Sequence, residues 1–322
     1  MFKIFEQLFR GETKTVSGYP NELIKRATDR AIDATDPRLR SLSSHRKQMH
    51  NAIVHAIDHV VSLVDNLRRP IPMSGADWSN QKILTAFFAS SNRMLDSITR
   101  DPCCRDFAST HPAPTATVSA LMLAKCTRKQ IFGYDTIGDK TVSDVMMTVV
   151  SFDEHRFIGL ANEETETRRL LKWRSFDYLL VIALQKITDA QKQRQDLTAR
   201  KKVLKAKLDI LKRCSGNLTA EPRQGDRENL QQKMNQVNAA LAEMGADDMV
   251  FQSHLNILIN TLDEAEKHLS CEEELLYLDH QHYERKPEDR QVTALELQKL
   301  TDNNKHQLAA QLVTMDPGCM PA

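Results

Sequence analysis

The 322-residue chain lacks a long hydrophobic run, and its longest strongly apolar stretch, residues 179–184, is far too short to span a bilayer. Glu6 interrupts the N-terminal segment where a signal peptide needs an uninterrupted apolar core. Net charge is also small, because 44 Lys and Arg side chains balance 43 Asp and Glu side chains. We therefore expect a cytoplasmic protein, and the whole-chain charge gives no argument for a nucleic-acid or anionic-membrane partner.

Sequence motifs of enzymes and metal proteins are missing as well. The six cysteines form no CxxC pair, and no HExxH, GxxxxGK[ST] or GxGxxG pattern occurs. Scattered cysteines are typical of reduced thiols, not of a zinc site or a disulfide framework. We expect no cofactor, and an enzyme whose site is assembled from residues distant in sequence remains an alternative.

The nearest approach to a metal motif lies in a predicted helix over residues 37–68. His55 and His59 are four residues apart, a spacing that can place two imidazoles on one metal ion. Helical geometry points Asp58 away from that face, so no third ligand is evident. We favour an exposed histidine-bearing face and keep the two histidines as candidate ligands.

The first ten residues predict a short amphipathic helix, attached by a polar tether that ends near residue 18. Four large apolar side chains share one face of this helix: Phe2, Phe5, Leu8 and Phe9. Such a helix can hold a protein at the inner face of a membrane, dock on a partner, or fold back onto the core. Peripheral membrane contact is therefore one hypothesis for this segment.

Two regions of different character follow. Residues 19–112 repeat apolar positions at three and four residues between turn signals, which predicts a helical bundle with helices over 20–35, 37–68 and 74–99. Residues 113–161 contain short β-type runs separated by glycines, which predict a small antiparallel meander of three or four strands.

The next region, residues 162–285, predicts a long antiparallel coiled-coil hairpin with its tip near residues 212–229. Apolar residues step by alternating threes and fours along 176–211 and again along 230–276. When the second arm is folded back on the first, apolar residues of the two arms face each other in pairs. The two residue numbers of each facing pair add up to a nearly constant total. The fold class expected is thus mainly α, with a helical bundle, this hairpin and the small meander.

The same register pairs the polar residues that interrupt the two arms. Arg194 is expected to meet Asp248, and Arg169 is expected to meet Glu272. A buried polar pair is a known way for a coiled coil to fix its register and orientation. These four residues are therefore the predicted register determinants.

Five basic residues lie close together on the first arm: Arg200, Lys201, Lys202, Lys205 and Lys207. They could contact nucleic acid or an acidic partner. No aromatic residues alternate with them, so a solvated helical face is the more common explanation.

Residues 286–322 predict one more helix and a flexible tail. Taken together, these features favour a non-enzymatic interaction protein, an adaptor, scaffold or regulator that presents the hairpin to a protein partner. A nucleic-acid-binding regulator that uses the basic residues of the first arm is the main alternative.

Overall fold

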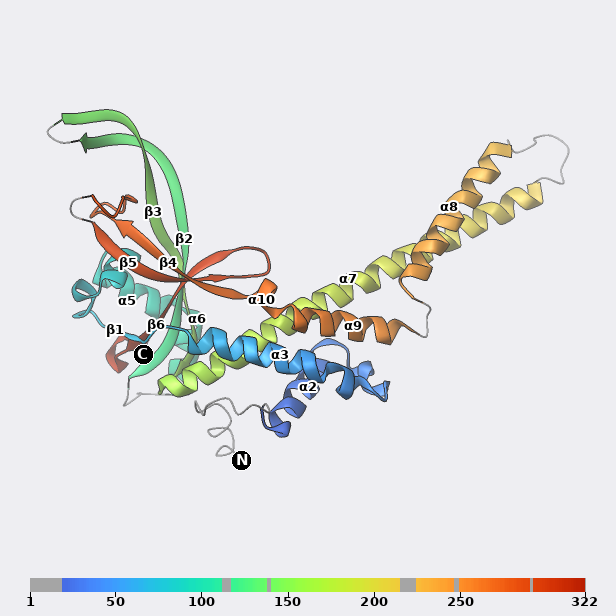
Figure 1. Ribbon diagram of the computed structural model, residues 1–322, viewed down its shortest axis with the longest axis horizontal. Helices are drawn as coiled ribbons and strands as arrows, with labels where there is room; N and C mark the ends of the chain where they lie inside the picture. The colour runs from blue at the N-terminus through green and yellow to red at the C-terminus, as the bar shows by residue number, and fades with distance from the viewer. Residues whose placement is uncertain are drawn as a thin grey trace. The chain divides into compact units, whose positions relative to one another are not determined.

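The structure is a computed structural model, and it describes residues 19–111, 117–137, 140–214, 224–245, 249–289 and 292–321 (Figure 1). The chain divides into two compact units. The described residues of Ile57–Phe176 and Ala265–Ala322 form the sheet unit, and those of Lys14–Ala56 and Asp177–Glu264 form the helical unit. Two helices, α3 (His45–Asp65) and α7 (Glu164–Cys214), contribute residues to both units.

The sheet unit is built on a six-stranded sheet. In chain order its strands are β1 (Ile71–Met73), β2 (Val118–Ile137), β3 (Lys140–Ala161), β4 (Ser270–Leu278), β5 (Thr293–Thr301) and β6 (Gln307–Met315). The spatial order is β3, β2, β6, β5, β4, with antiparallel neighbours, and the short β1 runs parallel to the end of β6. The last strand in the sequence therefore lies inside the sheet, between β2 and β5.

The β2–β3 hairpin is longer than the rest of the sheet, as Figure 1 shows. β6 pairs with β2 only over residues 118–125, so along the rest of the hairpin β2 pairs, among the described strands, with β3 alone. The turn after β4 reaches the outer edge of β3, where the amide of Glu284 donates to the carbonyl oxygen of Thr148 at 2.8 Å. This turn connects the two edge strands of the sheet.

Three short helices, α4 (Lys82–Phe87), α5 (Ser91–Arg100) and α6 (Pro102–Thr110), belong to the main core of the sheet unit. Side chains alternate between the two faces of a strand, so Val118, Ala120, Met122 and Ala124 of β2 join this core. Phe87 of α4 stacks on Phe152 of β3 with ring centroids 4.4 Å apart, and Phe157 is fully buried. Apolar residues of all six strands thereby share one core with these helices.

The first turns of α7 and the last turns of α3 are joined to each other and to the sheet by polar contacts. The buried hydroxyl of Thr167 donates to the carbonyl oxygen of Ser119 on β2 at 3.0 Å. The Arg168 guanidinium donates to the carbonyl oxygens of Val64 and Leu67, which lie at the end of α3. α7 thus supplies hydrogen-bond donors to carbonyl groups at the C-terminal end of α3, where the helix itself offers few.

The helical unit contains α2 (Asn21–Thr35), the 3-10 helix η1 (Pro37–Ser41), α8 (Gln224–Glu243) and α9 (Val250–Asp263), with parts of α3 and α7. Its buried residues recur at helical spacing on each element, for example Leu23, Ala27 and Ala31 on α2. Arg30 of α2 forms a bidentate ion pair with Asp177 of α7. Among the described residues, no helix is apolar enough over a sufficient length to cross a membrane.

The predicted long coiled-coil hairpin is wrong. Its expected second arm, residues 230–276, is divided among α8, α9, the four-residue α10 (Ala265–His268) and β4. Gly245, which follows α8, has a φ of +85°, a conformation outside the right-handed helical region. Leu276, placed in the heptad seam by its spacing, instead lies on β4 and faces the sheet core.

The predicted small meander is also wrong, because the sheet is large. Residues 113–161, for which three or four short strands were expected, supply two strands of 20 and 22 residues. Residues 286–322, for which a helix was expected, supply β5 and β6. β6 pairs with β2, which lies far away in the sequence, and such pairing is not visible in local spacing.

Candidate functional site

The five predicted basic residues lie on α7, and the side chains of all five are exposed. They do not share one face. At about 100° per residue, Arg200 and Lys207 lie on one side of the helix, Lys202 on a second, and Lys201 with Lys205 on a third. The cations therefore surround this part of α7 instead of forming one patch.

An apolar stripe runs along the exposed side of the same segment. Val203 and Ile210 are 54% and 59% exposed, and Ala199 and Ala206 are exposed too. These four positions step by four, three and four residues, so they lie on one side of the helix. Leu208, which is 7% exposed, points to the opposite side. We call Ala199, Val203, Ala206 and Ile210 the outer face of α7.

Of the first predicted register pair, the structure places only Arg194. Its guanidinium donates to the carbonyl oxygen of Gly245 at 2.8 Å. Asp248 lies outside the described residues. The predicted anchor also lies outside them: Phe2, Phe5, Leu8 and Phe9.

The second predicted register pair is split between different kinds of element. Arg169 lies on α7 and forms an ion pair with Glu166, about one turn earlier on the same helix. Glu272 lies on the strand β4, where its backbone pairs with Lys299 of β5. The coiled-coil register therefore does not apply to Glu272.

The two candidate metal ligands lie near backbone carbonyl groups. His55 Nδ1 is 3.5 Å from the carbonyl oxygen of Leu262, and His59 Nε2 is 2.7 Å from that of Leu269. Within the part of the chain that the structure describes, no group of three or more His, Cys, Asp or Glu side chains could hold a metal ion. The structure thus offers the two histidines no third ligand.

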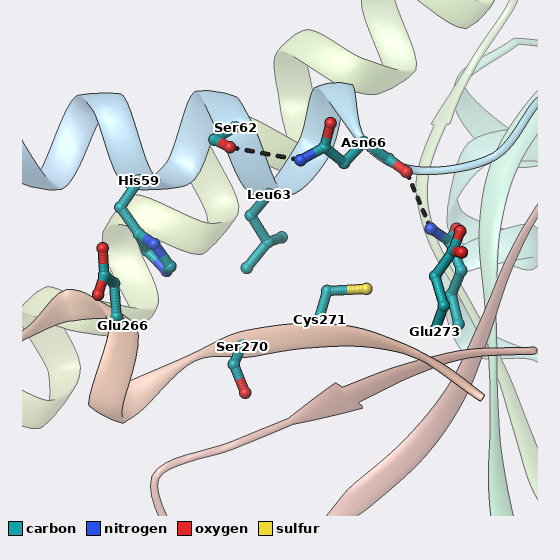
Figure 2. A pocket seen from close by; sticks show the side chains of 9 residues that line it. His59, Ser62, Leu63, Asn66, Glu266, Ser270, Cys271 and Glu273 are labelled. Carbon is teal, nitrogen blue, oxygen red and sulfur yellow. Dashed lines mark hydrogen bonds between the residues drawn. The ribbon is translucent and has the colours of Figure 1, made fainter.

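His59 instead lines a pocket of about 520 Å³ in the sheet unit, between α3 and β4 (Figure 2). Figure 2 shows His59 and Glu266 at one end and Asn66 and Glu273 at the other. Cys271 lies between these ends, on β4. The lining is mainly polar and carries two carboxylates, so the pocket can accept hydrogen bonds from a small polar or cationic group.

The Cys271 thiol is poorly suited to act as a nucleophile. Burial raises its pKa, and the nearby carboxylates of Glu273 and Glu272 raise it further. A thiol of this kind stays protonated at neutral pH, whereas nucleophilic catalysis requires the thiolate. The pocket therefore contains no activated sulfur nucleophile.

A polar cluster in the helical unit, formed by the buried side chains of Asp36 and His254 and the exposed Arg38, is absent from the sequence-based expectations. The Asp36 side chain, 4% exposed, accepts hydrogen bonds from Arg38 Nε at 2.8 Å and from His254 Nδ1 at 2.8 Å. Burial alone would raise the pKa of Asp36, but the hydrogen bonds from Arg38 and His254 outweigh burial and lower it. The cluster joins η1 to α9, and its only signal in the sequence is an Asp directly before the helix-starting Pro37.

Comparison with known proteins finds no matching family model, no matching curated protein and no matching solved structure.

Proposed function

We propose that this protein is a non-enzymatic interaction protein, an adaptor, scaffold or regulator, and that the outer face of α7 binds a helix of a protein partner. The observation that carries the proposal is the exposure of Val203 and Ile210, at 54% and 59%, on one side of the helix. Apolar side chains seven residues apart, rimmed by polar ones, fit the anchor spacing of helix-to-helix recognition.

The charges beside the outer face select the chemistry of the partner. Arg200 and Lys207 border one edge of the stripe and Lys202 borders the other, and all three are exposed. An amphipathic helix with acidic residues beside its apolar side complements this arrangement. A second copy of the same face would bring like charges together, which is unfavourable.

A binding role is also supported by the chemistry of the pocket in the sheet unit. Burial raises the pKa of Cys271, so its thiol is not activated as a nucleophile. The His59 ring lies 2.7 Å from a backbone carbonyl oxygen through Nε2, so that nitrogen is occupied. Neither side chain has the arrangement of a nucleophile and its base.

Nucleic-acid binding is the second candidate, and the five exposed cations of α7 favour it. Such binding depends on the number of phosphates neutralised and falls steeply with salt. The cations surround the helix, and residues 199–213 contain no aromatic side chain on which a base could stack. We therefore rank this function below binding of a protein helix.

The test is a lysine-directed crosslinking capture with the tagged full-length chain in a nuclease-treated extract of the source cell. The variant carries Val203→Ser and Ile210→Ser, and the matched control is Val181→Ser, an α7 valine that is 58% exposed. We expect a protein crosslinked at Lys202 or Lys207 through an acidic amphipathic segment. Its recovery should fall at least tenfold in the double variant and stay unchanged in the control, because interface anchors are each worth about 1–2 kcal/mol.

Two outcomes would contradict this proposal. Equal recovery with all three proteins would remove the outer face as the binding surface. Recovery from an untreated extract that is lost on nuclease treatment would assign the cations to nucleic acid, with Lys201→Glu weakening binding as much as Lys202→Glu.

A further inference from the structure

A second cleft in the sheet unit, of about 700 Å³, runs along the outer edge of β3. Three arginines from three different elements line it: Arg100 at the end of α5, Arg156 on β3 and Arg174 on α7. Its volume lies within the range of about 300–1,000 Å³ that is typical of small-molecule sites.

A β-bulge shapes the wall that carries Arg156. Leu123 of β2 pairs with Arg156 and Lys125 pairs with Asp153, so β3 contains one extra residue in this interval. Glu154 within the bulge has a φ of +54°, which is uncommon for a residue with a side chain. Bulges re-aim side chains at sheet edges, and here the bulge immediately precedes Arg156.

Packing of α7 on β3 positions Arg174. A Cβ atom added at Gly159 of β3 would be 3.0 Å from Leu171 Cδ2, so α7 and β3 are in close contact there. Arg174 lies about one turn after Leu171. Asp101, the residue that follows Arg100, is also held close to β3. Its Oδ2 atom accepts a hydrogen bond of 3.1 Å from the amide of Phe157.

Three arginines and two carboxylates line the cleft, and Arg100 also lies 3.8 Å from the carboxylate of Asp96. Asp101 lines the cleft, but both of its carboxylate oxygens accept backbone amides, those of Cys104 and Phe157. Glu154 is paired with Lys125 at 2.9 Å, and the hydrogen bond and charge of Lys125 and, to a smaller extent, the charge of Arg156 lower its pKa. Among the described residues, no carboxylate lies within ion-pair distance of Arg156 or Arg174.

The same wall contains a polar atom with no protein partner. His155 lines the cleft and stacks on Phe88 with ring centroids 4.2 Å apart. Its Nε2 atom is buried and has no hydrogen-bond partner in the described part of the protein. Buried polar atoms are normally hydrogen-bonded, so this wall retains unused polar capacity.

We propose that this cleft binds the phosphate group of a small soluble ligand, with Arg156 and Arg174 as the principal contacts and Arg100 at the rim. The planar guanidinium fork matches phosphate oxygens in a bidentate geometry, and a bound dianion gives Arg156 and Arg174 a partner of opposite charge. The proposal does not depend on the outer face of α7.

Isothermal titration of the full-length chain with inorganic pyrophosphate at low ionic strength tests this site. Saturable one-site binding is expected, and Arg156→Gln and Arg174→Gln should each weaken it by about tenfold or more, the effect of losing a charge-assisted hydrogen bond. Arg105→Gln is the matched control, because this exposed arginine of α6 lies outside the cleft lining. The Arg105→Gln variant should bind pyrophosphate with the affinity of the wild type.

Thermal unfolding without ligand separates a binding role from a structural one. Removing one of the cations that line the cleft should leave the midpoint unchanged or slightly raised, as in Arg105→Gln. A clear drop in the midpoint of Arg156→Gln and Arg174→Gln would make these arginines structural and overturn the proposal. It is equally overturned if millimolar pyrophosphate gives no saturable binding, or if Arg105→Gln weakens binding as much.

Discussion

At the scale of single residues, Asp36 illustrates how a buried carboxylate is kept ionised. Arg38 and His254 both donate hydrogen bonds to it, and these bonds outweigh the effect of burial and lower its pKa. The pKa of Asp36 is thus lower in the folded protein than the value of about 3.9 for an unfolded chain. Ionised Asp36 stabilises the fold at pH values above about 4, and this contribution is lost as the pH falls through the folded-state pKa.

We expect Asp36→Asn to lower the free energy of unfolding at pH 7 by about 2–3 kcal/mol, because Asn keeps the helix cap but loses the charge-assisted bonds. Urea titrations at a series of pH values measure this loss and should show a weaker pH dependence below about pH 4 in the variant. The control is Asp33→Asn, which removes an ion pair to Arg40 whose side chains are 55% and 53% exposed. Such a pair is worth under about 1 kcal/mol, so equal losses in the two variants would refute the role given to Asp36.

At the scale of elements, Gly159 determines how closely α7 approaches β3. Its φ of +68° belongs to the left-handed region that favours glycine. The space beside it is already filled by Leu171, because a Cβ atom at this position would lie only 3.0 Å from the leucine Cδ2. Backbone conformation and packing therefore both require glycine here.

Gly159→Ala should destabilise the protein by about 1–3 kcal/mol, through backbone strain and overpacking against Leu171. Gly318→Ala is the matched control, since an added Cβ at Gly318 would meet no atom within 4 Å. Thermal or urea unfolding of the two variants provides the comparison. A loss no larger in Gly159→Ala than in Gly318→Ala would show that the contact can relax.

Sequence patterns predicted some elements well and others badly, for physical reasons. The helix expected over residues 20–35 is found as Asn21–Thr35, because α2 buries one side at helical spacing. Residues 293–301 are rich in Ala, Leu, Glu and Gln, which favour helices, yet they form β5 because Leu295 and Leu297 alternate into the sheet core. The spacing of Leu269 and Leu276 fitted a heptad, but a strand takes over immediately after Leu269.

The arginine cleft could not be predicted in the same way. Arg100, Arg156 and Arg174 come from α5, β3 and α7, and they meet only because a bulge in β3 and the contact at Gly159 bring these elements together. The spacing of apolar residues along the chain does not indicate that these three elements come together. The exposed cations of α7, by contrast, follow each other along one helix and were visible in the sequence.

At the scale of the whole molecule, both units share the continuous helices α3 and α7. The two tryptophans, Trp78 and Trp173, both belong to the sheet unit. Tryptophan fluorescence therefore reports on the sheet unit, whereas far-UV circular dichroism reports on the helices of both units. The two signals can be compared to test whether the units unfold together.

Leu255→Ala removes a fully buried side chain of the helical unit and should cost about 2–5 kcal/mol. Because unfolding of one unit interrupts helices that the other unit needs, we expect the fluorescence and circular-dichroism midpoints in urea to fall together. The exposed substitution Val181→Ser should leave both midpoints unchanged. Separation of the two midpoints, with fluorescence unaffected by Leu255→Ala, would show that the units unfold independently.

The position of β6 has a consequence for synthesis of the chain on the ribosome. β2 is made early, but its partner over residues 118–125 is the segment 307–315, which emerges last among the strands. At translation rates of about 5–20 residues per second, the edge of β2 stays uncovered for on the order of ten to forty seconds. An unpaired strand edge readily pairs with another chain, so nascent copies on one messenger need this edge shielded, by a chaperone or by spacing between ribosomes, until β6 arrives.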